Sequence, residues 1–399
     1  MAATLPILPR ARAILPLLLA ASLVAACAGP RPLSGSRPTP ATTTPPPPAS
    51  ITPSLTYPLP EPPALPPVAP APLPTVTPPT SDTICLVLPL ESPAYGAAAA
   101  AVKAGFLAAA NAAGSASRTR IIAHGDDGVL PAFAAASEAG AALVVGPLTR
   151  DDLKTVLALA LARPRMLALN QPEEGSALPD EVYALSLSVE SDAELLARRA
   201  YADGARAVVT LASDAPLQRR FKAAFSVAWK RTGGSPTRDY RFDARPEALS
   251  ALRRELVARP TDATLLAVGA DDAPLAKAFL PPGPVYASSQ IADGLSAAML
   301  RDLEGVRYVE IPWLADPSGV TFARLPQTSL GDPVLDRLYA LGLDAFALAD
   351  LLANPIPPDR VEFDGATGHL ALTREHVFVR EGRIMVIRSG QPTPDAPIQ

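Results

Sequence analysis

Residues 84–114 read ICLVLPLESPAYGAAAAAVKAGFLAAANAAG, and this stretch decides the fold. Ile84–Leu88 is an uninterrupted apolar run followed by proline, which is typical of a strand buried on both faces of a parallel sheet. Residues 94–113 are rich in alanine and end at Gly114, which predicts a helix stopped by glycine. A buried strand followed directly by a helix begins a βαβ unit, so we expect an α/β fold.

Beyond this stretch, short apolar segments alternate with helical patterns as far as residue 287. The further expected strands are 119–123, 142–145, 165–169, 205–211, 239–242, 263–268 and 285–287. The further expected helices are 130–139, 150–162, one opened by Ser191 with Glu194 as its capping-box partner, 217–231, 246–258 and 273–279. The alternation predicts parallel sheets with right-handed crossovers, and the number of strands favours two α/β lobes over a single sheet.

The C-terminal part follows a different pattern. Pro333–Leu352 predicts one long amphipathic helix, and strand patterns follow at 369–372, 376–379 and 383–387. The sequence Arg380-Glu-Gly382 predicts a turn between the last two strands, so we expect those two strands to form a hairpin. We expect residues 391–399 to be a disordered tail.

The first 26 residues have the pattern of a lipoprotein signal peptide. A positively charged start precedes an apolar stretch, residues 13–23, that is shorter than the roughly 20 residues needed to span a bilayer. Val24-Ala-Ala-Cys27 resembles the lipobox of bacterial lipoproteins, so we expect a membrane anchor through lipid on Cys27. The alternative is an ordinary signal peptide with a chance cysteine. Residue 28 is Ala rather than Asp, which resembles outer-membrane sorting in Gram-negative bacteria.

Residues 27–82 show no hydrophobic periodicity and are dominated by proline, alanine, threonine and serine. Proline has no amide donor and a fixed φ angle, so the composition predicts a disordered, polyproline II-like tether. At about 3.1 Å per residue, such a tether would reach roughly 150 Å when fully extended. Two interpretations stay open: a passive stalk, or a spacer whose length carries the folded part away from its anchor.

Composition and motifs argue against several classes of function. The net charge is −4 with no long basic block, so nucleic acid is a poor candidate partner. With Cys27 carrying lipid, Cys85 has no partner for an intramolecular disulfide, and its apolar surroundings predict a buried thiol. The 3 histidines lack companions at metal-ligand spacing, and no Gly-x-Ser-x-Gly, Ser-x-x-Lys or glycine-rich phosphate motif occurs. We therefore expect no enzyme activity, no metal and no cofactor.

A ligand bound between two such lobes would contact residues at the carboxyl ends of the strands. The candidates in the first lobe are Tyr95, Thr149, Arg150 and Asn170, with Glu91, Ser92 and Gln171. The candidates in the second lobe are Ser213, Ser288 and Ser289, with Asp214. Arg150 could pair bidentately with a carboxylate. The alternative for each residue is a helix cap or an ordinary loop position.

Trp313 follows Ile311-Pro312 near an expected crossover between the lobes. It could be a surface contact for a partner, since aromatic residues are enriched in interface hot spots. It could equally be a packing anchor in the core, and this is the role that we favour.

Three local motifs resemble the type I periplasmic binding protein superfamily. They are Leu88-Pro-Leu90 before a helix with Gly105-Phe106, Val145-Gly-Pro-Leu148, and Phe363-Asp-Gly-Ala-Thr-Gly368. The resemblance implies two parallel, doubly wound α/β lobes connected by three crossovers. It also implies a folded region of residues 83–390, with a first lobe of about 83–187 and 313–355 and a second lobe of about 188–312 and 356–390.

A second set of motifs is more specific. It consists of Pro284-Val-Tyr-Ala-Ser-Ser289, Asp302-Leu-Glu-Gly-Val-Arg-Tyr308, Ile311-Pro-Trp-Leu314 and Leu338-Tyr-Ala-Leu-Gly-Leu-Asp344-Ala-Phe346. Their order and spacing resemble the LppC/LpoA family, whose members are lipoprotein activators of class A penicillin-binding proteins. The best-known members carry a helical-repeat domain before this region, and here the proline-rich tether stands in its place.

The resemblance implies an outer-membrane lipoprotein that faces the periplasm and binds the periplasmic part of a class A penicillin-binding protein. It would stimulate peptidoglycan synthesis allosterically, and peptidoglycan itself is a further expected partner. The rival hypothesis is a solute-binding lipoprotein for an amino acid or a similar small molecule, because that is the commonest use of the superfamily. A third alternative is a purely structural envelope lipoprotein.

Overall fold

The computed structural model describes residues 82–125, 127–159, 163–172, 177–317, 319, 322–325, 327–354 and 360–395. The expected signal peptide, the lipid-bearing Cys27 and the tether up to residue 81 lie outside the described residues. Within the described part, no helix combines the length and the apolar character that crossing a bilayer requires.

The first sheet has five parallel strands in the order β2-β1-β3-β4-β5. They are β1 (Ile84–Leu88), β2 (Thr119–Ala123), β3 (Leu143–Val145), β4 (Met166–Ala168) and β5 (Val182–Ala184). All five side chains of β1 are buried, as expected for a central strand with helices on both faces. Each large apolar side chain contributes roughly 1.5–3 kcal/mol when it leaves water, so β1 forms the centre of this core.

Helices cover both faces of the first sheet. They are α1 (Gly96–Ala112), α2 (Val129–Glu138), α3 (Arg150–Leu157) and, much later in the chain, α10 (Pro333–Leu352). A short 3-10 helix, η1 (Ala116–Arg118), follows α1. Residues of α1 and α10 share a core on one face, and residues of α2 and α3 share a core on the other.

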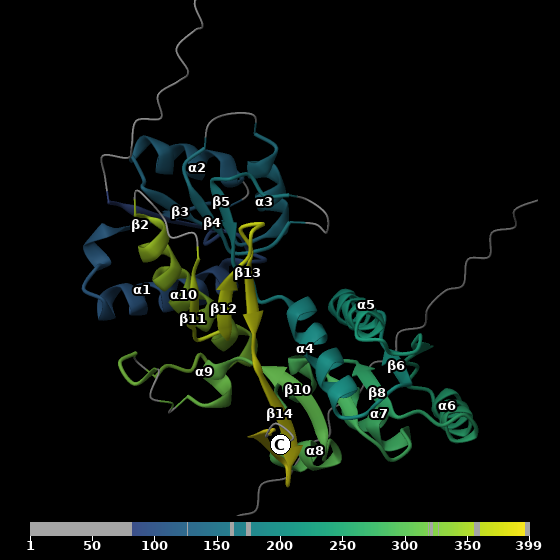
Figure 1. Ribbon diagram of the computed structural model, residues 1–399. Coiled ribbons are helices and arrows are strands. Elements are labelled where there is room, and N and C mark those ends of the chain that lie inside the picture. The colour runs from purple at the N-terminus through teal and green to yellow at the C-terminus, as the bar shows by residue number, and fades with distance from the viewer. Residues whose placement is uncertain are drawn as a thin grey trace, which may run out of the picture. The chain divides into compact units, whose positions relative to one another are not determined.

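Two glycines allow α1 and α10 to pack closely together (Figure 1). A Cβ atom at Gly105 of α1 would overlap the backbone carbonyl oxygen of Tyr339. Likewise, a Cβ atom at Gly342 of α10 would overlap the backbone carbonyl oxygen of Val102 in α1. The backbones of the two helices are therefore in direct contact at these positions.

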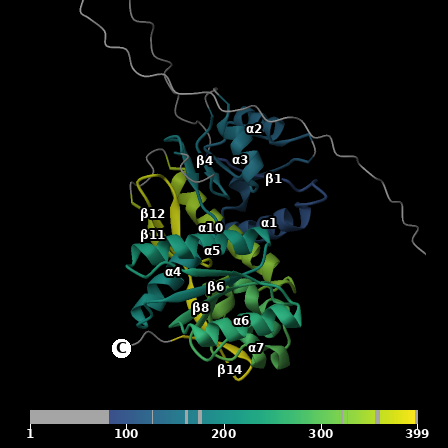
Figure 2. The same cartoon turned by 90° about the vertical axis from the view of Figure 1, so that its right-hand side faces the viewer.

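The second sheet has seven strands in the order β15-β14-β10-β9-β8-β6-β7. They are β6 (Val208–Ala212), β7 (Arg238–Arg241), β8 (Ala263–Ala267), β9 (Val285–Ala287), β10 (Val306–Glu310), β14 (Arg383–Arg388) and β15 (Gln391–Pro394). Its helices are α4 (Val189–Ala202), α5 (Pro216–Arg231), α6 (Pro246–Ala258), α7 (Ala273–Phe279), η2 (Ser289–Ala292) and α8 (Ala297–Asp302). Figure 2 shows α4 and α5 on one side of β6 and β8, and α6 and α7 on the other.

A third, antiparallel sheet packs with the first one. It consists of β11 (Glu362–Asp364), β12 (His369–Leu372) and β13 (Phe378–Glu381). Leu370 and Phe378 belong to the hydrophobic core around α1 and α10, and Val377 forms a parallel bridge to Ala184 of β5. The expectation that residues 356–390 belong to the second lobe is therefore wrong for β11–β13, because their apolar side chains are buried against the first.

The expected hairpin around Arg380-Glu-Gly382 is also wrong. β13 pairs with β12, and the chain continues from β13 into β14 of the second sheet (Figure 1). Gly382 lies at this passage, where a Cβ atom would be 2.6 Å from Cγ1 of Val309 and 2.9 Å from the carbonyl oxygen of Glu310. The glycine thus permits a close crossing between two sheets instead of a turn.

Three further details differ from the expectations. β15 pairs antiparallel with β14, so residues 391–394 are a strand and not part of a disordered tail, while residues 396–399 lie outside the described part. Ser188, not Ser191, caps α4, because its hydroxyl oxygen accepts a hydrogen bond from the amide of Ser191 (3.3 Å). The sequence patterns also miss β5, β10, α8 and the short α9 (Pro312–Ala315).

The chain passes between the two halves three times: after β5, after β10, and between β13 and β14. Below, the first lobe means β1–β5 with α1–α3, α10 and β11–β13, and the second lobe means β6–β10, β14 and β15 with α4–α8. The predicted architecture of two α/β lobes connected by three crossovers is confirmed.

Candidate functional site

A cavity of about 390 Å³ lies between the two lobes and is termed the cleft cavity. Four of the candidate residues line it: Tyr95, Thr149, Arg150 and Asn170. They follow three different strands of the first lobe, β1, β3 and β4, which end at the same edge of the sheet. The remaining lining residues are Ala98, Leu148, Asp151, Leu169, Ser186, Leu187, Ser188, Arg220, Leu338 and Leu341.

Asn170 orients the guanidinium of Arg150. Nε of Arg150 donates to Oδ1 of Asn170 (3.2 Å), and Nδ2 of Asn170 donates to the carbonyl oxygen of Leu148 (3.0 Å). The amide of Gln171 donates to the same Oδ1 (3.0 Å). Among the described residues, nothing hydrogen-bonds the two terminal nitrogens of Arg150, so they are free to bind a ligand.

Two helices begin at the cleft cavity. Thr149 caps α3, because its hydroxyl oxygen accepts from the amide of Asp152 (3.1 Å) while it donates to the Asp152 carboxylate (2.6 Å). Ser188 caps α4 in the same manner. The N-terminal ends of helices carry partial positive charge, and here the first turn of each helix already holds two carboxylates of its own, Asp151 and Asp152 in α3 and Glu190 and Asp192 in α4.

Ser186 lines the same cavity, and only 7% of its surface is exposed. Its hydroxyl makes no hydrogen bond to any described residue. A buried polar group without a partner costs roughly 1–3 kcal/mol and is uncommon in native proteins. This hydroxyl is therefore a donor and acceptor that the fold itself leaves unused.

On the second-lobe side, Arg220 of α5 is bound to Glu190 of α4. Nε of Arg220 donates to Oε1 of Glu190 (2.9 Å), and Nη2 donates to Oε2 (3.1 Å). Burial alone would raise the pKa of Glu190, but hydrogen bonds from Arg220 and Ser188 outweigh burial and hold that pKa below its ordinary value. Arg220 is thus neutralised by its partner, and among the described residues that line the cavity Arg150 is the cation with free donors.

A wider groove of about 700 Å³ adjoins the cleft cavity, and both share Arg150 and Arg220 as lining residues. Gln171 lines this groove. Of the other candidates near the carboxyl ends of the strands, Glu91 is exposed, Ser92 accepts a weak hydrogen bond from the amide of Tyr95 (3.4 Å), and Asp214 pairs with Arg241 at the surface. These three do not line the cleft cavity.

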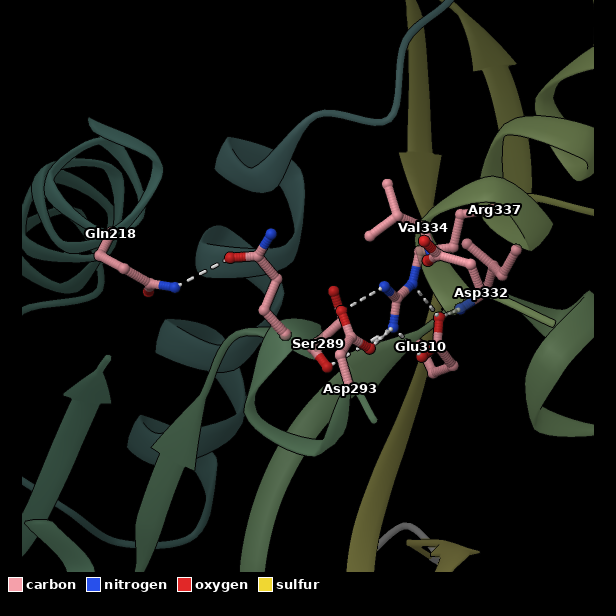
Figure 3. Close-up of polar contacts among 9 residues, drawn as sticks. Gln218, Ser289, Asp293, Glu310, Asp332, Val334 and Arg337 are labelled. Atoms are coloured by element: carbon pink, nitrogen blue, oxygen red, sulfur yellow. Dashed lines mark hydrogen bonds and ion pairs between the residues drawn. The ribbon is translucent and has the colours of Figure 1, made fainter. Parts of the chain in front are cut away.

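A second cavity, of about 160 Å³, lies beside the crossovers and is termed the hinge cavity. Residues of both lobes line it, and four of them are charged: Asp192, Glu310, Arg337 and Arg380. Figure 3 shows the guanidinium of Arg337 between the carboxylates of Asp293 and Glu310. Nη1 and Nη2 of Arg337 donate to Asp293 (2.9 and 2.8 Å), while Nε and Nη2 donate to Glu310 (3.0 and 2.7 Å).

Burial and ion pairing act in opposite directions on these groups. Burial would lower the pKa of Arg337, but the hydrogen bonds to Glu310 and Asp293 outweigh burial and raise that pKa above its ordinary value.

The second buried arginine of the hinge cavity is Arg380 of β13, which is 4% exposed. It binds Asp192 of α4 together with the carbonyl oxygens of Ser188 (3.3 Å) and Thr367 (3.0 Å).

The remaining candidates do not reach the cleft cavity. Ser289 lines the hinge cavity and offers its carbonyl oxygen to Arg337, and buried Ser288 donates to Oε1 of Gln218 at 3.4 Å. Ser213 hydrogen-bonds the carbonyl oxygen of Ala267 through its amide and lines neither cavity. 

Trp313 is only 2% exposed. Its ring packs against the rings of Phe322 and Tyr339, with centroids 5.6 and 5.7 Å apart. The possibility that Trp313 contacts a partner at the surface is therefore wrong, and the residue is a packing anchor of the first lobe's core.

Sequence reasoning missed Ser186, Arg220 and the four charged residues that line the hinge cavity. One signal was present for Arg380, because it follows the apolar Phe378 by two residues and residues two apart in a strand share a face; in the structure both are buried, while Val379 and Glu381 are exposed. This alternation places the arginine on the inner face of the strand. Arg337 gave no such signal, since an arginine on an amphipathic helix usually faces water.

Among the described ranges, no group of three or more His, Cys, Asp or Glu side chains is arranged to hold a metal ion. Cys85 is a free, fully buried thiol in β1, and burial raises its pKa. Neither feature adds a reactive group to the cleft cavity.

The chain is similar to several known proteins. The family model described as "LppC putative lipoprotein" matches residues 67–252 and 250–383. A penicillin-binding protein activator LpoA from Enterobacter sp. is 27% identical over 299 residues, which cover 64% of this chain and 41% of that protein. The chain therefore matches less than half of the length of this curated relative.

Two solved structures resemble the folded part. A "putative branched-chain amino acid ABC transporter" from Chromobacterium violaceum has 33% sequence identity and a TM-score of 0.66, and the match covers 76% of this chain and 99% of that one. The C-domain of LpoA from Haemophilus influenzae, described as a regulator of PBP1A, has 23% identity and a TM-score of 0.66, covering 79% of this chain and 100% of that one. At this identity, the second likeness concerns the fold alone.

Proposed function

This chain belongs to the LppC lipoprotein family, and from that premise we propose that it activates a class A penicillin-binding protein. The observation that carries the proposal is the extent of the family match, which runs from residue 67 to residue 383. It covers the first lobe, most of the second lobe and the three crossovers, and not merely an α/β half that many binding proteins share. The curated Enterobacter relative, which is named an activator, is similar over 64% of the chain.

The likeness to the Haemophilus C-domain supports this proposal from a second direction. The match covers all of that domain, and that domain is described as a regulator of a penicillin-binding protein. The two-lobed part of this chain thus has the fold of the regulatory domain. We place the contact with the synthase on this part.

Lipid on Cys27 would anchor the protein in the outer membrane, with the folded part in the periplasm. The lipobox-like Val24-Ala-Ala-Cys27 and the alanine at position 28 support this placement. The proline-rich residues 28–81 would then bridge the distance between the anchor and an enzyme that is rooted in the inner membrane.

The proposed action is binding and not catalysis. An activator shifts its partner toward the active state only if it binds that state more tightly than the inactive one. A preference of about 1.4 kcal/mol changes the ratio of the two states about tenfold. The activating surface must therefore contact a part of the synthase that differs between its states.

A second candidate is solute binding for transport or sensing. It is favoured by the cleft cavity, whose volume of about 390 Å³ suits a small molecule, and by the 33% identity to the structure of the Chromobacterium protein. The two candidates are separable, because a solute-binding protein needs no contact with a synthase.

The test uses the mature chain with Cys27→Ser, which removes the lipid and keeps the tether and both lobes. It is titrated against the periplasmic part of a class A penicillin-binding protein from the same cell, with binding and the rate of peptide cross-linking as readouts. Saturable binding with a faster rate is the expected result. A correctly folded chain that neither binds nor stimulates the enzyme would refute the activator proposal and favour solute binding.

A further inference from the structure

We infer that the last part of the proline-rich tether, residues 73–81, docks into a groove on the first lobe. The groove has a volume of about 620 Å³ and lies beside the neighbouring helices α1 and α10 (Figure 1). It is termed the α1 groove, because residues of α1 between Ala104 and Ala112 line it, together with Arg324, Thr328 and Tyr339. Its lining residues are distinct from those of the cleft cavity and the hinge cavity. The inference requires no synthase and so goes beyond the proposed function.

Small side chains give the α1 groove a surface that fits proline rings. Ala104, Ala108 and Ala112 are spaced four residues apart, so they lie on one face of α1. Leu107 lines the groove beside them and is half-buried. The pyrrolidine rings of a polyproline II segment pack on such an apolar surface, and the preformed conformation of the segment keeps the entropy lost on docking small.

The polar groups of the groove are mainly hydrogen-bond donors. Tyr339 is only 2% exposed, and its hydroxyl makes no hydrogen bond to any described residue. Asn111 and Arg324 are exposed at the groove and add amide and guanidinium donors. A polyproline II segment has no internal hydrogen bonds and proline has no amide proton, so such a segment offers chiefly carbonyl oxygens. The donors of the groove are therefore complementary to the acceptors of the segment.

The tether joins the folded part near the same end of α1. Asp82 is the first described residue, and its Oδ2 lies 3.9 Å from Nε of Arg118, which follows shortly after the last residue of α1. The nine residues 73–81 span about 28 Å as polyproline II, whereas the stretch of α1 from Ala104 to Ala112 is about 12 Å long. The segment is thus long enough to turn back at Asp82 and run along the groove.

The family match favours this segment as the occupant over an unrelated partner. The match begins at residue 67, before the first described residue, so the family pattern includes residues 73–81 together with the lobes. Pro74, Pro78 and Pro79 provide three rings, and none of the nine residues is charged. Docking therefore buries no unpaired charge of the segment.

The experiment measures a distance within the mature Cys27→Ser chain by pulsed electron double resonance. One spin label is attached at Ala71→Cys, just before the segment, and the other at Ala134→Cys, an exposed position of α2 in the first lobe. Cys85 is fully buried and stays unlabelled. A docked segment should give a narrow distance distribution, whereas an undocked tether should give a broad one. Dilution with unlabelled chain restricts the signal to labels within one chain.

Three variants connect the narrow distribution to the groove. Ala112→Lys places a charged side chain in the groove at an exposed helical position and should lower the ratio of docked to free segment at least about tenfold. Ala251→Lys, at an exposed position of α6, is the matched control and should leave the ratio unchanged. Tyr339→Phe keeps the ring and removes only the hydroxyl, so it should lower the ratio about threefold or more.

A synthetic peptide of residues 67–81 should compete for the groove and broaden the distribution. The same peptide with Pro74, Pro78 and Pro79 replaced by alanine should not do so at equal concentration, because the preformed conformation and the rings are lost.

A broad distribution in a folded chain with an unchanged groove would overturn the inference. So would a narrow one that survives Ala112→Lys, equal effects of Ala112→Lys and Ala251→Lys, or a ratio unaffected by Tyr339→Phe. A narrow peak that disappears on dilution with unlabelled chain would assign the groove to the tether of a second copy, which also contradicts docking within one chain.

Discussion

Arg337 of α10 binds Glu310 at the end of β10 through two parallel hydrogen bonds, Nε to Oε1 at 3.0 Å and Nη2 to Oε2 at 2.7 Å. The two side chains are only 11% and 8% exposed. Since α10 packs in the core of the first lobe and β10 is a strand of the second sheet, the pair joins the lobes at a crossover. Arg337 also binds Asp293 of the second lobe, so one guanidinium satisfies two carboxylates.

We expect Arg337→Met to lower the free energy of unfolding by about 3–5 kcal/mol, because it leaves the carboxylates of Glu310 and Asp293 without their cation. Chemical denaturation of the mature chain measures this loss. Arg254→Met, at an exposed position of α6, is the matched control and should change stability by less than about 0.5 kcal/mol. If both variants lose the same small amount of unfolding free energy, the ion pairs of Arg337 with Glu310 and Asp293 do not hold the lobes together.

Asp344 makes the stability depend on pH. Its carboxylate accepts hydrogen bonds from the amides of Ala366 and Thr367 (both 2.7 Å) and from the hydroxyl of Thr367 (2.6 Å). Burial raises the pKa of Asp344 from its ordinary 3.8 to about 6, against the opposing effect of these hydrogen bonds. The folded chain therefore binds more protons than the unfolded chain between these two pKa values, and stability falls as pH rises through that window.

The contribution of Asp344 is fully present below about pH 4 and is lost above about pH 6, and it amounts to about 3 kcal/mol, since one pKa unit is about 1.4 kcal/mol. Asp344→Asn has no such titration. The difference in unfolding free energy between the native chain and this variant should thus shrink with rising pH, as measured by urea denaturation at both ends of the window. Parallel pH profiles of the two proteins would contradict the raised pKa.

Gly105→Ala tests the contact between α1 and α10. Alanine in the middle of an unhindered helix stabilises by about 0.5–1 kcal/mol relative to glycine, but here the added Cβ would overlap the carbonyl oxygen of Tyr339. We therefore expect a loss of about 1–3 kcal/mol, visible as a lower thermal midpoint. Gly269→Ala is the control, because nothing lies within 4 Å of a Cβ at that position. A stabilised Gly105→Ala variant would show that the two helices do not touch there.

The helices and strands with strong local signals are predictable from the sequence. Pro333–Leu352 is the expected long helix with its predicted bounds, and Ile84–Leu88 is the expected buried strand. In both segments, the apolar pattern along the chain and the burial in the fold agree. Short strands such as Val182–Ala184 have too few residues for a periodic pattern, so only the pairing with β4 defines them.

The sites were predictable only in part. Tyr95, Thr149, Arg150 and Asn170 follow strands of one parallel sheet, and this local rule brings them together at one edge. Arg337 and Glu310 are paired across 27 positions and from different lobes, so no local rule could join them. Sequence alone does not distinguish a turn glycine from a glycine at a close approach. Gly382 is of the second kind, because the crossing of the two sheets brings it against Glu310.

Deleting residues 28–81 while keeping Cys27 and the signal peptide tests whether the tether provides reach. The proposed partner is rooted in the inner membrane and the proposed anchor is in the outer one, so a folded part held directly at its anchor would not meet the synthase. We expect activation in cells, read as peptide cross-linking of the cell wall, to fall to the level of a strain without the protein. The Cys27→Ser chain without residues 28–81 should bind the isolated synthase as tightly as the Cys27→Ser chain that keeps them, because the contact is proposed for the lobes.

A scrambled tether of the same length and composition is the control and should restore activation, since a polyproline II-like spacer depends on composition and not on order. Full activation by the deleted chain in cells would mean that the tether is a passive stalk.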